Sequence, residues 1–432
     1  MRINVKTLFA FALASLLLGF LAHSYLGRGR VWRDQDFHGY YFTAQIFHDN
    51  PHANIYEGAG KRNPIAQSAP SDSVISTYAK SAGVSEVGPY VYPPLLADLF
   101  VPLSRIPVSQ AAVLWRACNL AFVLVSVLLL ARMMRISTLS FEFVALAMAG
   151  YCFFPISEGI MIGNATVLMF VLWTAGIAAY FDGRVVLSAA IFALATAFKV
   201  TPILLFPLFI VWKDRRWIVS YIAASIGLVV AMIGINGWQT VRIYPSVMSS
   251  MNSGLPIFIN KALGSLVAWI YYGRVLSLES AQMISANEPS SLVIATTAVN
   301  GIFYLICLFL VWRTRHIERA SRAVTIAVFG LITTCLSPAP YRYAYTVAFI
   351  ALAIYWVRTL RAPRTQPLRA LLLTFTTFTL GVLFFDLAAE APLPRFIQIV
   401  LAALWIVFTV LFSIDALYHA SEDERVSEAT TA

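Results

Sequence analysis

Long apolar runs recur along the whole chain of 432 residues. A membrane-spanning helix needs about 20 consecutive apolar residues, and only helices or closed barrels satisfy their backbone polar groups inside lipid. The runs are too long for barrel strands, which alternate in polarity over about 10 residues. We therefore predict an all-α polytopic membrane protein with about 12 transmembrane helices, at 5–26, 108–131, 139–161, 164–182, 185–200, 202–212, 217–236, 291–312, 323–337, 341–357, 368–387 and 395–417.

The composition excludes soluble classes of protein. Charged residues make up 12% of the chain, about half of the roughly 25% usual in soluble domains. A net charge of +10 would suggest nucleic acid as partner of a soluble protein. Here we attribute it to arginines in cytoplasmic loops, so the predicted partners include membrane lipids and no nucleic acid. The cysteines all lie in apolar runs and are predicted to be packing residues: Cys118, Cys152, Cys307 and Cys335.

The distribution of basic residues predicts the orientation. With a cytoplasmic N-terminus, the short inner loops hold 14 lysines and arginines, whereas the short outer connections hold three, Lys199, Arg342 and Arg395. Short cytoplasmic loops are enriched in such residues, so both termini are predicted to be cytoplasmic. We treat 1–420 as a single membrane domain and 421–432 as an acidic cytoplasmic tail. The run 202–212 is too short to span and is interpreted as the second arm of a helix broken at Thr201-Pro202.

Two long segments, 27–107 and 237–290, are predicted to be exoplasmic loops that contain interfacial or re-entrant helices. The first begins with Asp34 and Asp36, next to an amphipathic run. A partly buried carboxylate near the membrane surface could accept a proton from an incoming hydroxyl. The structural alternative is a solvated loop in which Asp36 caps the helix that follows. A nucleotide-sugar metal site with D-x-D spacing is disfavoured, because the chain lacks a strand-based nucleotide domain.

Two cationic elements on the same predicted face suggest an anion site. Lys199 ends an apolar helix, and intramembrane ionisable residues usually have a partner; the alternative is that Lys199 snorkels to the interface. Arg342 and Tyr343 lie in a proline-bounded aromatic turn, which fits a phosphate and a sugar ring or an ordinary aromatic belt. No metal site is predicted from His38, His48 and His52, and no cofactor is expected, although a divalent cation is possible.

Several motifs occur in an order typical of a known family. They are Asp36-Phe37 with Tyr40-Tyr41, Tyr92-Pro93-Pro94-Leu95 followed by Pro102-Leu103 and Ile106-Pro107, Gly163-Asn164, Ala197 to Pro202, and Asn260 to Leu263. Together they resemble glycosyltransferase family 87, polyprenyl-phosphate-sugar-dependent membrane enzymes of the C-type superfamily. The chain departs from the family pattern at 337–345, where Tyr341 replaces a tryptophan and Tyr343-Ala344 replace two histidines.

The resemblance implies an inverting hexosyltransferase of the bacterial inner membrane with a periplasmic or extracellular site. Mannose is the expected sugar, carried on a polyprenyl phosphate and passed to a lipid or glycan hydroxyl. Asp36 is the expected base, with Asp34 second, and the expected substrate-binding residues are Lys199, Arg342, Tyr343, Tyr92, Asn164 and Asn260. Two alternatives remain: a transporter or flippase of lipid-linked sugars, and a non-catalytic subunit of an envelope-assembly complex.

Overall fold

The computed structural model describes residues 5–26, 34–50, 53–56, 73–85, 87–249, 260–275, 289–337, 340–362, 366–382 and 394–420. Over these ranges it confirms an all-helical fold, in which the one extended pairing is a bridge between Asn260 and Tyr341. The predicted tail at 421–432 and the segments 27–33 and 57–72 lie outside the described residues, as do Arg364 and His52.

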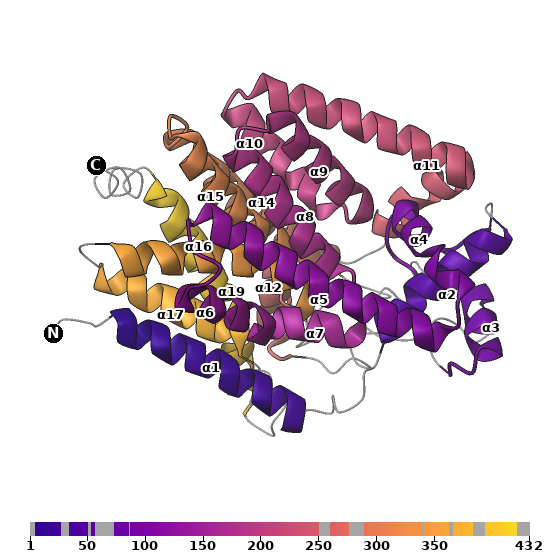
Figure 1. The fold of residues 1–432 in the computed structure, drawn as a ribbon, viewed down its shortest axis with the longest axis horizontal. Coiled ribbons are helices and arrows are strands. Elements are labelled where there is room, and N and C mark those ends of the chain that lie inside the picture. The colour runs from indigo at the N-terminus through magenta and orange to yellow at the C-terminus, as the bar shows by residue number, and fades with distance from the viewer. Residues whose placement is uncertain are drawn as a thin grey trace.

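The described residues form a succession of α-helices (Figure 1). In chain order they are α1 (Val5–Leu26), α2 (Gln35–Asp49), α3 (Val74–Ser81), α4 (Pro94–Phe100), α5 (Val108–Met133), α6 (Phe141–Cys152), α7 (Phe154–Ile162), α8 (Thr166–Phe181), α9 (Val185–Phe198), α10 (Phe206–Val211), α11 (Arg215–Ser249), α12 (Leu263–Tyr272), α14 (Ser290–Arg313), α15 (Arg319–Cys335), α16 (Ala348–Arg361), α17 (Pro367–Gly381) and α19 (Arg395–Tyr418). Three short 3₁₀ helices, η1 (Leu103–Arg105), η2 (Thr201–Leu205) and η3 (Arg342–Val347), complete the described chain.

Among the described residues, five helices are long and apolar enough to cross a membrane: α5, α11, α14, α16 with η3, and α19. A sixth span exists if α6 and α7, which are bent by 54° at Phe153, are counted as one. Other predicted runs form shorter apolar helices, among them α8 with 16 residues and α9 with 14. At 1.5 Å per residue, such helices are shorter than the ~30 Å hydrocarbon layer. The described residues thus make an integral membrane protein, with five or six candidate spans where the sequence predicts twelve.

Three predicted features of individual elements are resolved by the structure. The break after α9 occurs at Lys199 and Val200, and the chain resumes as η2 and α10, as the short run 202–212 predicts. Helix α11 continues to Ser249 through a kink at Gly237, so the predicted second loop begins as helix. The four cysteines are free, and three of them are buried, as predicted for packing residues.

The two ends of the helical bundle differ in chemistry. Near the start of α5, Trp115 donates its indole N–H to the carbonyl of Gly163, just before α8, at 2.8 Å. Near the end of α5, Arg132 pairs with Asp182, just after α8, at 2.8 Å. Helices α5 and α8 therefore run parallel. We call the end at Gly163 the site end and the end at Arg132 the basic end.

The loops predicted to be cytoplasmic gather at the basic end. Arg361, the last residue of α16, donates to the carbonyl of Met134, just after α5, at 2.7 Å. The guanidinium of Arg322 lies over the ring of Trp212, and that of Arg313 lies over the ring of Tyr418 at the end of α19. These contacts join the end of α16 to the end of α5, the start of α15 to the end of α10, and the end of α14 to the end of α19. One end of the molecule is thus rich in arginine, as the predicted topology requires.

The first predicted loop folds over the site end, where α2, α3 and α4 are grouped (Figure 1). Tyr41 of α2 donates to the carbonyl of Ile106 at 2.7 Å, and Tyr56 donates to the carbonyl of Tyr92 at 2.8 Å. Below them, the rings of Phe100 and Trp115 meet edge to face with their centroids 4.6 Å apart. The aromatic residues of this segment therefore hold α2 and α4 against the start of α5.

Candidate active site

Asp36 lies in the first turn of α2 and faces the turn that connects α7 and α8. Its Oδ2 accepts a hydrogen bond of 2.6 Å from Nδ2 of Asn164, although the two residues are 128 positions apart. Asp34, not Asp36, occupies the N-cap position of α2, and the segment is a buried helix. The alternative of a solvated loop with Asp36 as helix cap is therefore wrong.

The turn at Gly163 brings Asn164 to Asp36. Gly163 has φ +70°, a left-handed conformation that strains any side chain, and a Cβ there would lie 2.6 Å from Cβ of Phe37. Only glycine permits this close approach of α2. Oδ1 of Asn164 accepts from the backbone N–H of Thr166 at 2.8 Å. That bond orients the amide, so its NH₂ group points at Asp36.

Aromatic hydroxyls complete the surroundings of Asp36. Nδ2 of Asn164 also reaches the hydroxyl of Tyr92 at 3.2 Å, and the ring of Tyr92 meets that of Tyr40 edge to face at 5.3 Å. Tyr343, from η3, hydrogen-bonds the Asp36 carboxylate. Four segments that are distant in sequence thus converge on one carboxylate: α2, the residues before α4, the start of α8, and η3.

Opposing effects act on the pKa of Asp36. Burial raises it from the ordinary 3.8, and this effect dominates. The hydrogen bonds from Asn164 and Tyr343 and the positive charge of Lys199 lower it in part. Lys199 stands at the break between α9 and η2, with extended backbone at φ −153°. A half-buried carboxylate with a raised pKa and a nearby cation can serve as a general base.

Asp34 has a different environment from Asp36. Arg116 of α5 binds both of its carboxylate oxygens, with Nε to Oδ1 at 3.2 Å and Nη2 to Oδ2 at 2.5 Å. A two-point ion pair of this kind fixes the orientation of both groups. The pair ties the start of α2 to α5, and the geometry favours Asp36 over Asp34 as the base.

Arg342 is engaged by an acidic residue that the sequence analysis did not single out. Its Nη2 lies 2.9 Å from Oε1 of Glu158, in α7, and its guanidinium lies over the ring of Phe154. Glu158 is an acidic residue inside the predicted apolar run 139–161, where an ionisable residue calls for a partner. That signal could have identified the pair. If Arg342 bound a phosphate, its guanidinium would contact both that phosphate and Glu158.

Asn260 belongs to a backbone junction beside the site. Its Oδ1 accepts from the N–H of Ala262 at 3.2 Å, and its backbone bridges to Tyr341. The next residue, Lys261, donates its N–H to the carbonyl of Pro340, and its own carbonyl accepts from the hydroxyl of Tyr345 at 2.7 Å. The second predicted loop thus supports the turn that carries Tyr343.

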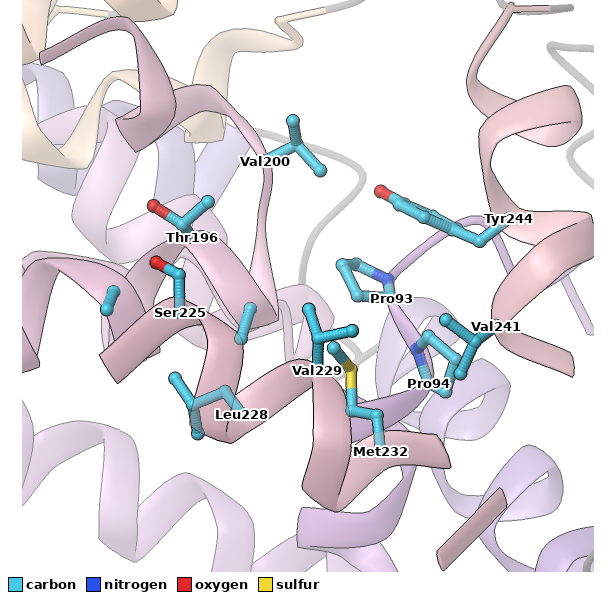
Figure 2. A pocket seen from close by; sticks show the side chains of 12 residues that line it. Pro93, Pro94, Thr196, Val200, Ser225, Leu228, Val229, Met232, Val241 and Tyr244 are labelled. Atoms are coloured by element: carbon cyan, nitrogen blue, oxygen red, sulfur yellow. The ribbon is translucent and has the colours of Figure 1, made fainter. Parts of the chain in front are cut away.

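An apolar groove of about 140 Å³ adjoins the site between α9, α11 and the start of α4. Figure 2 shows Pro93 and Pro94 facing Val229 and Met232, with Val200 above them. Pro93 directly follows Tyr92, and Val200 directly follows Lys199. The groove therefore begins beside two of the residues that surround Asp36.

Within the described part of the chain, no three His, Cys, Asp or Glu side chains are grouped closely enough to hold a metal ion. Asp36 is surrounded by an amide, tyrosine hydroxyls and a lysine, which are hydrogen-bond donors rather than the several oxygen ligands that Mg²⁺ or Ca²⁺ prefers.

Comparison with models of known protein families finds a match. The model of glycosyltransferase family 87 matches residues 90–338, more than half of the chain. The matched part contains Tyr92, Asn164, Lys199 and Asn260, whereas Asp36 and Tyr343 lie on either side of it. No curated protein matches the chain.

Proposed function

The chain belongs to glycosyltransferase family 87, and from this premise we propose that it moves a hexose from a polyprenyl-phosphate donor to a hydroxyl of a lipid or glycan acceptor. Mannose is the proposed sugar. The proposed fold is that of the C-type superfamily, with the shorter helices completing the twelve spans. The observation that carries the proposal is the half-buried Asp36 carboxylate, which accepts a hydrogen bond of 2.6 Å from Asn164 and feels the positive charge of Lys199.

The proposed reaction is a single displacement at the anomeric carbon. Asp36 takes the proton of the acceptor hydroxyl as its oxygen bonds to the anomeric carbon, while the bond from that carbon to the phosphate oxygen breaks. The electron pair leaves with the phosphate, so polyprenyl phosphate is released and the configuration inverts. A phosphate leaves without a strong general acid, which accords with the absence of a second carboxylic acid in contact with Asp36 among the described residues.

Lys199 is the proposed partner of the departing phosphate. A fixed cation beside the position where negative charge grows stabilises the transition state more than the ground state. Tyr92 and Tyr343 border the same space and are proposed to position the sugar. Arg342 supports the site through its pair with Glu158.

The apolar groove is the proposed path of the donor's isoprenoid chain. It begins next to Lys199 and Tyr92, is lined mainly by aliphatic side chains of α9 and α11, and includes Val229 of α11, an exposed apolar residue (Figure 2). An isoprenoid in this groove would place its phosphate at Lys199 while its tail passes toward the lipid.

The proposed location of the site is the exoplasmic face of the inner membrane. Its support is the separation of the two ends of the molecule: the arginine-rich loops gather at the end opposite Asp36. Because such loops are enriched on the cytoplasmic side, the site would face the periplasm.

The second candidate function is a transporter of lipid-linked sugars. The 54° bend between α6 and α7 and the break after α9 favour it, since broken helices at a binding site are typical of transporters. A transporter leaves its cargo intact, whereas a transferase releases polyprenyl phosphate. Incubation of the purified chain with the donor and an acceptor separates the two by that product.

We expect Asp36→Asn to reduce transfer by at least about 100-fold, the usual contribution of a general base, because an amide cannot accept the proton. Binding of the donor should change little. The measurement is release of polyprenyl phosphate by purified protein, with donor binding measured separately. The matched control is Asp49→Asn, at the exposed end of the same helix. Turnover of Asp36→Asn equal to that of the control would remove Asp36 from the mechanism.

A further inference from the structure

A second cavity lies in the other half of the molecule, away from Asp36. It has a volume of about 460 Å³ and is lined by residues of α1, α6, α16 and α17. Figure 1 shows α1 running alongside α6 and α17, on the side of the bundle away from α11. Well-packed interiors contain few voids larger than a water molecule. A cavity of this size in a membrane protein therefore calls for an occupant.

The cavity is charged at one end and apolar at the other. Lys6, Glu142 and Arg361 line it at the basic end, where Arg361 is held in place by its bond to the carbonyl of Met134. Leu16, Phe153 and Phe349 line it farther in, and all three are buried. With two cations and one carboxylate, the end of the cavity at the basic end of the molecule carries a net positive charge.

The length of the cavity corresponds to one leaflet of a bilayer. Lys6 and Leu16 are ten residues apart on α1, which is about 15 Å along a helix that rises 1.5 Å per residue. The hydrocarbon layer is about 30 Å thick, so the apolar part reaches about halfway across. Charge at headgroup level followed by one leaflet of apolar lining matches a phospholipid.

We propose that this cavity binds one anionic glycerophospholipid from the leaflet at the basic end, with its phosphate at Lys6 and Arg361 and an acyl chain between α1, α6 and α16. The lipid joins the first helix to the rest of the bundle. Water would find almost no partners among the aliphatic and aromatic side chains of the inner part. The site is separate from the proposed donor groove and does not depend on the transferase assignment.

The test is native mass spectrometry of the full chain in detergent with dioleoyl phosphatidylglycerol. The wild-type protein should retain one lipid, and phosphatidylcholine should be retained at least tenfold less. The double variant Lys6→Gln with Arg361→Gln should lose retention at least tenfold. The control, Arg215→Gln with Arg216→Gln, removes the same charge from exposed residues of the basic end and should behave as wild type.

A second pair of variants tests the apolar part of the site. Ala145→Leu with Ala353→Leu fills the cavity and should abolish retention while raising the Tm in lipid-free detergent, because it replaces empty space with packed atoms. Ala231→Leu with Ala298→Leu adds the same bulk to exposed positions of α11 and α14 and should change neither quantity. Equal retention by the charge variant and its control would overturn the proposal, as would preferential retention of polyprenyl phosphate.

Discussion

Asp36 and Asp34 are two residues apart, yet the fold gives them opposite environments. Asp34 is bound at both oxygens by Arg116, whereas Asp36 is half-buried, is hydrogen-bonded by an amide and a tyrosine, and lies in the field of Lys199. The residues that decide between them, Arg116 and Asn164, lie more than 80 positions further along the chain. The local sequence therefore identifies both carboxylates as candidates for the general base, but it gives no physical reason to prefer one of them.

At this scale we predict the direction of a pH effect. A base must be deprotonated, so transfer should rise with pH through the raised pKa of Asp36. Asn164 and Tyr343 lower that pKa by hydrogen bonding to the charged form. Removing either donor, by Asn164→Ala or Tyr343→Phe, should move the acidic limb of the pH–rate profile to higher pH.

The control for this measurement is Tyr78→Phe, which removes a surface hydrogen bond to Asp49 and should leave the limb in place. A limb that moves to lower pH in Asn164→Ala or Tyr343→Phe would mean that these donors do not stabilise the Asp36 carboxylate.

The same linkage predicts an effect on stability. Since the folded protein holds the Asp36 proton more tightly than the unfolded chain does, its free energy of unfolding falls as pH rises from about 3.8 through the raised pKa. Asp36→Asn carries no such charge and should show a smaller fall in Tm over that range. A fall as large as that of the wild-type protein would show that other groups account for it.

At the scale of elements, the site depends on how closely α2 approaches the turn before α8. Gly163→Ala should disturb this contact, because the new Cβ overlaps Phe37 and a left-handed alanine costs about 1 kcal/mol or more. We expect a lower Tm and a loss of transfer larger than the loss of folded protein. Gly227→Ala, in α11, meets no atom within 4 Å and should be neutral or stabilising. Equal effects of the two changes would contradict the predicted role of this turn.

The groove between α9 and α11 leads to a prediction about donor length. Ala197→Trp places a large ring among Pro93, Val200 and Tyr244 and should raise the KM for a long-chain polyprenyl donor several-fold. A donor with one or two isoprene units should be affected less, because its tail extends less far into the groove. Ala231→Trp, at an exposed position of the same α11, is the control. An identical effect on long and short donors would place the tail elsewhere.

At the scale of the whole molecule, the separation of the arginine-rich loops from the site predicts which end faces the cytoplasm. In intact cells, a membrane-impermeant maleimide should label Lys80→Cys, exposed on α3 at the site end, and should not label Arg216→Cys at the basic end. The native cysteines are buried or half-buried, so the wild-type protein serves as the unlabelled control. The reverse pattern of labelling would place the proposed transferase site in the cytoplasm.

Sequence patterns determined the class of this protein and the candidate residues for its site. Apolar run length and scarce charge specify helices in a membrane, because both express the cost of placing polar groups in lipid. That cost acts on each segment separately, so it is visible along the chain. This cost does not determine how many of the helices cross the membrane. Helices α8 and α9, for example, are apolar but shorter than the hydrocarbon layer is thick.

Only the tertiary structure decided which candidates act together. The pairs Asp36 with Asn164, Asp34 with Arg116 and Arg342 with Glu158 each join residues at least 82 positions apart. Such contacts arise from helix packing, in which a single glycine at 163 sets the approach of two elements. Hydropathy does not encode partners, because many pairings of helices bury the same apolar area. Side-chain fit and the need to neutralise each buried charge select one of them.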